Sequence, residues 1–200
     1  MYTDHRARPV LRKVRMEPKA FFIESWCEER GRWVRRLIDA QIHAADRAMY
    51  HLPELLWALT ADVPVWWCEG EKDADAIRGV GGVATSHWQG AGHATRGQAR
   101  WFTRGRGPIL LVVDVDRSGA GAACALARKR LLLAAGVERS RIRLRKPPHP
   151  HKDAAAAIEA GRSLAEFRKP NEAAMTRLAQ EYTTTRKQRR ESSDWMGAAS

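Results

Sequence analysis

Residues 108–119, PILLVVDVDRSG, decide the fold. The first six are continuously apolar, which is typical of a short strand buried on both faces of a parallel sheet. Asp114 and Asp116 follow at once, and the Ala- and Leu-rich residues 119–135 predict a helix that ends at Gly136. Because side chains two apart on a strand project to the same side, we expect the two carboxylates to face one point.

The same alternation of strand and helix continues on both sides of this stretch. Residues 63–68, VPVWWC, predict a second buried strand, in which Trp66 and Trp67 point to opposite faces of the core. Such alternation predicts a parallel-rich sheet covered by helices. The other expected elements are a helix ending near residues 79–82, a strand at 83–86, a helical patch at 98–102, a half-exposed strand at 141–144 and a helix at 154–160.

The two ends of the chain do not show this alternation of strand and helix. Residues 1–52 predict a small N-terminal α+β subdomain with strands at 10–15 and 21–23. Residues 53–170 form the predicted main domain. Residues 171–200 predict a helix followed by a disordered basic tail, since they contain too few apolar side chains to pack.

Composition narrows the class of protein. The chain carries 35 Lys and Arg against 23 Asp and Glu, a net charge of +12, which favours a polyanionic partner. No apolar run approaches the ~20 residues of a membrane-spanning helix, and the N-terminus lacks the apolar core of a secretory signal. Cys27, Cys68 and Cys124 lie far apart, which excludes a disulfide framework or a zinc ribbon built from this chain and fits a reducing cytosol.

A second acidic motif, CEGEKDAD at residues 68–75, follows the strand at 63–68 and places Glu69 at its end. In open α/β sheets, ligands bind beyond the carboxyl ends of the strands. Three carboxylates from neighbouring strand ends repel one another unless a cation lies among them, and oxygen ligands alone select Mg²⁺ or Mn²⁺. Glu71 and Asp73 have a second interpretation, because acids at a helix start also complement the helix dipole.

Taken together, these motifs make the chain resemble a Toprim domain, the topoisomerase–primase fold, of the primase kind found in bacterial, phage and mobile-element replication proteins. The matching stretches are VWWCEGEKDADAI, ILLVVDVDRSG and HKDAAAAIEAG, and RPVLRKVRMEPKAF and MYHLPELLWAL resemble the region that precedes such domains. The resemblance covers roughly residues 10–165. It implies a mainly parallel four-stranded central sheet flanked by helices, with a small N-terminal α+β appendage.

The resemblance also implies an activity, that of an Mg²⁺-dependent DNA primase-type nucleotidyltransferase. Glu69 would act as general acid/base or metal partner, Asp114 and Asp116 would bind the metal, and Asp73 and Asp153 match supporting acidic positions. Single-stranded DNA and nucleoside triphosphates are the implied partners, and the cytoplasm of a bacterial cell or phage-infected host is the implied location. We expect no zinc and no membrane association.

Some parts of a complete primase are missing from the sequence. We find no ligand set for a zinc ribbon, no Walker A motif and no helicase domain after residue 170. Either a separate replicative helicase or zinc-binding module supplies these parts, or the protein is a reduced relative. Two alternatives therefore stay open: a non-catalytic Toprim module that binds nucleic acid for a separate helicase or primase, and a Toprim nuclease that uses water as the nucleophile.

Basic side chains surround the acidic motifs. Arg141, Arg143 and Arg145 alternate, so we expect them to share one face of a strand and to contact phosphates rather than form a solvated edge. Trp101 lies among arginines, a combination that suits stacked single-stranded bases. The candidate phosphate- and nucleic-acid-binding residues are Lys72, Arg96, Arg100, Trp101, Arg141, Arg143, Arg145 and Lys152.

Overall fold

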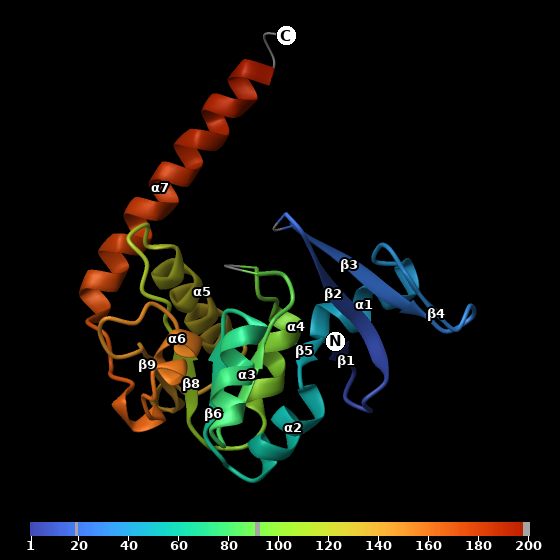
Figure 1. The fold of residues 1–200 in the computed structure, drawn as a ribbon, viewed down its shortest axis with the longest axis horizontal. Coiled ribbons are helices and arrows are strands. Elements are labelled where there is room, and N and C mark those ends of the chain that lie inside the picture. Colours follow the sequence, from blue (N-terminus) through green and yellow to red (C-terminus); the bar gives the residue numbers. More distant parts are fainter. Residues whose placement is uncertain (19, 91–92, 198–200) are drawn as a thin grey trace.

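The computed structural model describes residues 1–18, 20–90 and 93–197, and the side chains of these ranges as far as residue 188. Within them the chain forms a parallel sheet ordered β7-β6-β8-β9 and an antiparallel sheet ordered β4-β3-β2-β1-β5. Figure 1 shows the parallel sheet and its helices as one body, with β2, β3 and β4 extending to one side of it. Of the helices described, none is long and apolar enough to cross a lipid bilayer.

The parallel sheet confirms the predicted α/β class. Side chains of β6 and β8 are buried throughout, and successive residues point to opposite faces. Trp67 and Leu111 pack with α5 in one core cluster, whereas Trp66 and Leu110 pack with α3 and α6 in another. Both tryptophans are core residues, as predicted. The bounds are β6 (Val65–Cys68), β7 (Val83–Ser86), β8 (Ile109–Val112), β9 (Ile142–Arg145), α3 (Glu71–Gly79), α5 (Ala120–Ala134) and α6 (Ala154–Glu159).

The N-terminal strands are longer than the sequence predicts. β1 pairs with β5 through Tyr2 and Tyr50, which brings the start of the chain next to its first long connection into the main domain. That connection is α2, which packs against β6 and β7. A domain boundary near residue 52 stays a prediction. The bounds are β1 (Tyr2–Thr3), β2 (Pro9–Met16), β3 (Ala20–Cys27), β4 (Arg32–Val34), α1 (Asp39–Arg47), β5 (Met49–Tyr50) and α2 (Leu52–Thr60).

The C-terminal segment contains the predicted helix, and a disordered basic tail at its end stays a prediction. Helix α7 (Glu172–Gly197) packs its first turns against α5 through Met175 and Ala179, and Glu172 forms a 2.6 Å ion pair with Lys129. The helix then runs away from the rest of the molecule (Figure 1). The apolar surface of α5 accounts for the packing of the first turns, and the outer turns occupy the segment for which the sequence predicts a disordered basic tail. Residues 198–200 lie outside the described part.

Short helical turns complete the connections. Helix α4 (Arg96–Ala99) and the 3-10 turn η1 (Arg100–Thr103) fill the predicted helical patch between β7 and β8. A second 3-10 turn, η2 (Arg139–Arg141), leads into β9, and a third, η3 (Leu164–Glu166), follows α6. The position of η2 matters for the basic residues discussed below.

Candidate metal centre

Glu69 and Asp114 lie at the carboxyl ends of β6 and β8, the neighbouring strands at which the strand order of the parallel sheet reverses. From β6 the chain crosses through α3 to β7 on one side, and from β8 it crosses through α5 to β9 on the other. β6 and β8 are therefore neighbours whose connections diverge, and ligands of open α/β sheets bind in the crevice beyond such a pair. Glu69 follows β6 directly, and Asp114 lies two residues beyond β8.

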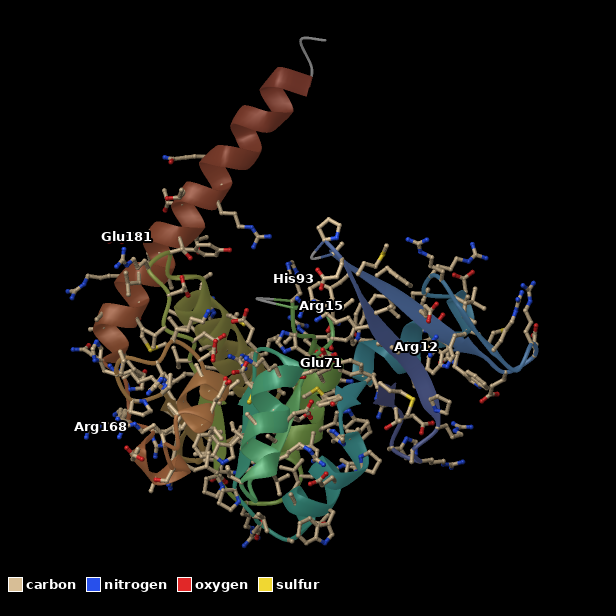
Figure 2. The ribbon with its side chains drawn as sticks, in the orientation of Figure 1. Arg12, Arg15, Glu71, His93, Arg168 and Glu181 are labelled. Carbon is tan, nitrogen blue, oxygen red and sulfur yellow. The ribbon has the colours of Figure 1, made fainter. Side chains whose placement is uncertain are left out.

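A cleft of about 390 Å³ opens at this point. Acids from both predicted motifs line it, and so do two residues from the third matching stretch. In Figure 2 the labelled Glu71 marks the start of α3, directly after the turn that carries Glu69. The lining residues are Glu69, Asp114, Val115, Asp116, Ser118, Ala120, Gly121, Lys152 and Asp153.

Among the acids of the cleft, Asp114 gives the clearest indication of a ligand. Its Oδ1 atom is buried and has no hydrogen-bond partner among the described residues. Burial, reinforced by the charges of Asp73 and Glu69, raises the pKa of Asp114 to about 7, although the positive charge of Arg128 opposes this shift. A buried, unpaired carboxylate is unfavourable. The cleft therefore presents an oxygen atom that a cation would satisfy.

Asp116 lines the same cleft but already has partners. Its carboxylate accepts hydrogen bonds from the Ser118 hydroxyl and from the backbone N–H groups of Ala120 and Gly121, the last at 2.7 Å. Partial burial alone would raise the pKa of Asp116, but these bonds outweigh burial and lower it. Glycine at position 121 lets the start of α5 lie close to the backbone of Asp114, since a Cβ there would lie 2.2 Å from the Asp114 carbonyl oxygen.

Asp73 and Asp153 hold the third stretch in place. Asp73 is buried, and its Oδ1 accepts a 3.0 Å hydrogen bond from the backbone N–H of Ala155, which joins α3 to α6. Asp153 caps α6 by accepting a 2.7 Å bond from the N–H of Ala156, and it also lines the cleft. Asp73 does not line the cleft. In this structure it supports the fold of the site.

The donor set fits a hard divalent cation. Carboxylate oxygens are its preferred ligands, and within the described part of the chain the Asp114 Oδ1 atom has no hydrogen-bond partner. No group of three or more His, Cys, Asp or Glu side chains in the described ranges is arranged to enclose a metal ion. Mg²⁺ commonly binds through one or two carboxylates and completes its shell with water and phosphate oxygens, so an open arrangement suits it.

Two predicted nucleic-acid contacts are wrong. Trp101 is 4% exposed, its Nε1 donates to the Arg47 carbonyl at 2.7 Å, and two arginine side chains cover its ring, so it cannot stack on bases. Arg141 is 8% exposed and donates to the carbonyls of Gly107 and Phe102 at 3.0 and 3.1 Å. It lies in η2, one residue before β9 begins, and so does not share the exposed face of that strand.

The other basic candidates remain available for phosphate. Lys152 lines the cleft beside Asp153, whereas Lys72 is exposed on α3 and does not line it. Arg143 is exposed and Arg145 half-buried on β9. Arg96 and Arg100 are exposed at α4 and η1.

Arg128 is a residue that sequence reasoning missed. It lies within α5, is 1% exposed, and donates hydrogen bonds to the carbonyls of Trp67 at 2.6 Å and Val112 at 2.7 Å. A pattern of Ala, Leu and basic residues does not separate it from Arg130, which is exposed on the same helix. Only the fold shows that one arginine points into the core.

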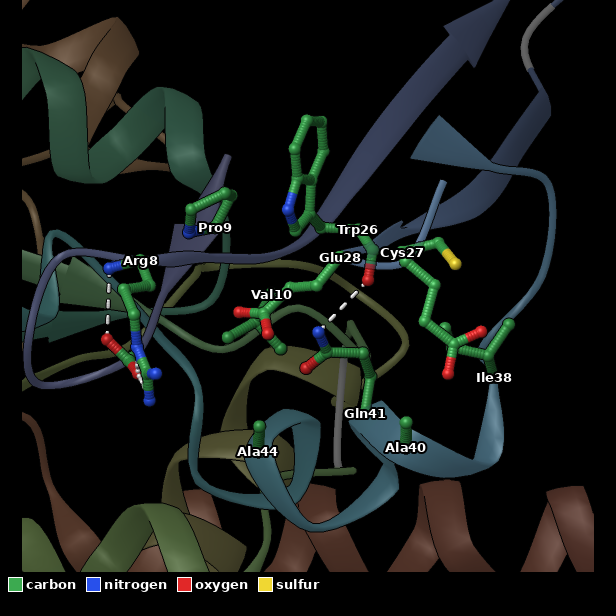
Figure 3. A pocket seen from close by; sticks show the side chains of 12 residues that line it. Arg8, Pro9, Val10, Trp26, Cys27, Glu28, Ile38, Ala40, Gln41 and Ala44 are labelled. Carbon is green, nitrogen blue, oxygen red and sulfur yellow. Dashed lines mark hydrogen bonds and ion pairs between the residues drawn. The ribbon is translucent and has the colours of Figure 1, made fainter. Parts of the chain in front are cut away.

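Another pocket, of about 370 Å³, lies between α1 and the strands β2 and β3 (Figure 3). Within it the side chain of Gln41 donates a 3.0 Å hydrogen bond to the Trp26 carbonyl, and Arg8 forms a 2.8 Å ion pair with Asp4. None of its lining residues belongs to the acidic motifs. The candidate chemistry therefore rests on the cleft at β6 and β8.

No protein-family model and no curated protein matches the sequence. Solved structures do match. A bacteriophage T7 complex of lagging-strand DNA polymerase with gp4 primase domains is 21% identical over 80% of this chain and 69% of its own, with a TM-score of 0.50. A DnaG primase catalytic domain bound to single-stranded DNA is 18% identical over 88% and 57%, with a TM-score of 0.52. The E. coli primase catalytic core is 16% identical over 82% and 59%, with a TM-score of 0.51.

These similarities establish the fold. The chain has the Toprim primase fold that the motifs imply, with the parallel sheet and the antiparallel sheet both present. It spans between about half and two-thirds of the length of the solved chains it matches. At this level of identity the similarity describes architecture.

Proposed function

We propose that the chain is an Mg²⁺- or Mn²⁺-dependent, primase-like nucleotidyltransferase that joins nucleoside triphosphates into primers on single-stranded DNA in the cytoplasm of a bacterial or phage-infected cell. The proposal rests on the Oδ1 atom of Asp114, which has no hydrogen-bond partner among the described residues and lies in a cleft lined by acids from separate motifs. The primase architecture supports it.

Each side chain of the cleft has a role that fits its surroundings. Asp114 and Asp116 would hold the cation, with Asp153 beside them, and Glu69 would accept the proton of the attacking 3′-hydroxyl. Lys152 would meet the triphosphate. A divalent cation bound here would stabilise the attacking and leaving oxygens of the displacement. Asp73 would act indirectly, by holding α6 against α3.

The strand of nucleic acid would be held by charge. Arg143 and Arg145 on β9 and Arg96 and Arg100 near α4 are the accessible arginines of the predicted set. We assign them phosphate contacts without base recognition, since phosphate contacts position a strand and do not read its sequence. Lys72 on α3 is a further candidate for the incoming triphosphate.

A primer-synthesis assay tests the proposal. The protein is incubated with single-stranded DNA, nucleoside triphosphates and Mg²⁺, and short products are resolved on a gel. Glu69→Gln and the double variant Asp114→Asn with Asp116→Asn should each lose product while circular dichroism shows an intact fold. Glu159→Gln, at an exposed position on α6 outside the cleft, is the matched control and should keep wild-type activity. Wild-type product from both cleft variants would refute the assignment.

A non-catalytic module that binds nucleic acid for a separate helicase or primase is the second candidate. It is favoured by one observation: the carboxylates of Asp116, Asp73 and Asp153 already accept backbone hydrogen bonds. In that case the wild-type protein binds single-stranded DNA but yields no product in the same assay. Shortening of labelled DNA would instead identify the Toprim nuclease.

A further inference from the structure

Arg128 is a buried cation whose hydrogen bonds go to the backbone. Its side chain is 1% exposed, and none of the ion pairs found within the described residues includes it. Both terminal nitrogens donate to carbonyl groups, and its guanidinium lies 5.9 Å from the centre of the Trp67 ring. Burying a charge is unfavourable, so the contacts it makes need a reason beyond packing.

The two carbonyls that it binds belong to neighbouring strands. Trp67 lies in β6, two residues before Glu69, and Val112 ends β8, two residues before Asp114. The guanidinium therefore joins the two segments that lead to the acids of the cleft, each at a carbonyl two residues before an acid. It connects β6 and β8, the pair of strands at which the strand order of the sheet reverses.

The strands separate at this same place. Pairing between β6 and β8 ends at the pair Trp67–Leu111. Beyond it, β8 remains bonded to β9 on its other side, since the N–H of Val113 donates to the Arg145 carbonyl at 2.8 Å. The cleft opens where β6 and β8 separate, and at this point Arg128 donates hydrogen bonds to one carbonyl of each strand. Its short bonds fix how far apart the strand ends can move.

Arginine suits this task better than lysine. A guanidinium is a planar fork with parallel N–H groups, so it can hold two acceptors at a fixed separation, whereas an ammonium group has no fixed direction. Its positive charge also lies close enough to act on Asp114. A neutral apolar side chain would remove both of these hydrogen bonds.

We propose that Arg128 is a positioning residue that sets the separation of the two strand ends, so that Glu69 and Asp114 can meet one divalent cation. The inference rests on the proposed function of the cleft. It adds a residue that neither motif contains, and it gives α5 two roles at the site. At the start of α5 the N–H groups of Ala120 and Gly121 donate to Asp116, and in its middle Arg128 binds the strand ends.

Arg141 provides a matched control. It is a second buried arginine, 8% exposed, whose guanidinium also donates to backbone carbonyls. One of its acceptors, Gly107, lies two residues before β8 begins, at the end of that strand opposite the acids. Replacing Arg141 should disturb the fold to a similar degree without moving the cleft.

The test compares Arg128→Lys with Arg141→Lys in the full chain. Mn²⁺ affinity is measured by electron paramagnetic resonance of free Mn²⁺, and the melting temperature of each variant is recorded without metal. We expect Arg128→Lys to weaken Mn²⁺ binding by roughly 10- to 100-fold, the usual effect of losing a group that orients metal ligands. Arg141→Lys should stay within about twofold of wild type although its melting temperature falls comparably. Arg128→Gln, which keeps one donor, serves as a second variant.

Each outcome has one meaning. Wild-type Mn²⁺ affinity in Arg128→Lys, or equal losses in the two lysine variants, would overturn the positioning role and leave the proposed function intact. Absence of Mn²⁺ binding by the wild-type protein would overturn the metal centre and the proposed function with it. If neither Arg128 variant folds at low temperature while Arg141→Lys does, Arg128 is required for folding and the positioning role is wrong.

Discussion

The hydroxyl group of Tyr2 donates a 2.7 Å hydrogen bond to Glu71 Oε1, which joins the first strand of the chain to the first turn of α3. Tyr2 is fully buried, and burial together with the charge of Glu71 raises the pKa of its phenol. Glu71 follows Glu69 by two residues. The bond therefore ties the antiparallel sheet to the turn that carries one of the candidate catalytic acids.

Tyr2→Phe should lower the free energy of unfolding by about 1.5–3 kcal/mol, because it removes one hydrogen bond to a charged acceptor and keeps the ring in place. Tyr50→Phe is the control. Its hydroxyl donates to Asp75 at 3.1 Å in an exposed setting, where water can replace it, so we expect a change below about 0.5 kcal/mol. Urea unfolding at neutral pH measures both. Equal losses would show that the Tyr2 bond has no special weight.

Asp114 should make stability depend on pH. Its pKa is raised from 3.8 to about 7, so between these values the folded protein holds a proton that the unfolded chain has released. Stability from this group is therefore present at low pH and is lost as the pH rises through about 7. Asp114→Asn removes the effect. In EDTA at pH 8 the variant should be more stable than wild type by roughly 2–4 kcal/mol, at about 1.4 kcal/mol per pKa unit.

Comparison of the two proteins at pH 4 supplies the control, because the difference should largely vanish there. Addition of Mg²⁺ at pH 8 should stabilise the wild-type protein and leave Asp114→Asn unchanged, since only a charged carboxylate gains from the cation. Thermal unfolding at each pH measures these differences. A constant stability gap across the pH range would contradict the assigned burial of Asp114.

Asp73 should separate a supporting role from metal binding. Asp73→Asn keeps an oxygen that can accept the Ala155 N–H, so we expect a stable protein and primer synthesis within about threefold of wild type. Asp73→Ala leaves that N–H buried without a partner and should lower the free energy of unfolding by about 1–3 kcal/mol. Urea unfolding and the primer assay are run side by side. Loss of activity in a stable Asp73→Asn protein would return Asp73 to the set of metal ligands.

The parallel sheet could be predicted because its strands are recognisable from the local sequence alone. Residues 63–68 and 108–113 are short apolar runs bounded by polar turns, and a strand buried on both faces needs little else. The cleft could also be anticipated, since carboxyl ends of adjacent parallel strands meet at one edge. What the pattern did not settle was which of the acids keeps a free oxygen. That depends on whether a helix start lies close enough to bind the carboxylate, as it does for Asp116.

The errors share a different cause. Trp101 was expected to be exposed because arginines surround it in the sequence, yet the ring is covered by Arg47, which comes from α1. Arg141 was expected to share a face with Arg143, but it precedes the strand, and its guanidinium donates to the carbonyls of Gly107 and Phe102. In both cases a contact between distant segments decided the outcome. Local spacing carries no information about such contacts. The buried position of Arg128 also depends on contacts with distant strands, so it could not be predicted from the sequence.

Salt dependence of binding should distinguish accessible arginines from buried ones. Each phosphate contact on single-stranded nucleic acid contributes about −0.7 to the slope of log affinity against log salt concentration. Replacing Arg143 and Arg145 together with Ala should therefore make the slope shallower by about 1.4 if both contact phosphate. Arg141→Ala should leave the slope unchanged and lower stability instead, because its guanidinium satisfies carbonyls inside the protein. Fluorescence anisotropy with labelled oligonucleotides at several salt concentrations gives the slopes. A slope unaltered by the double change would mean that this edge of β9 faces solvent only.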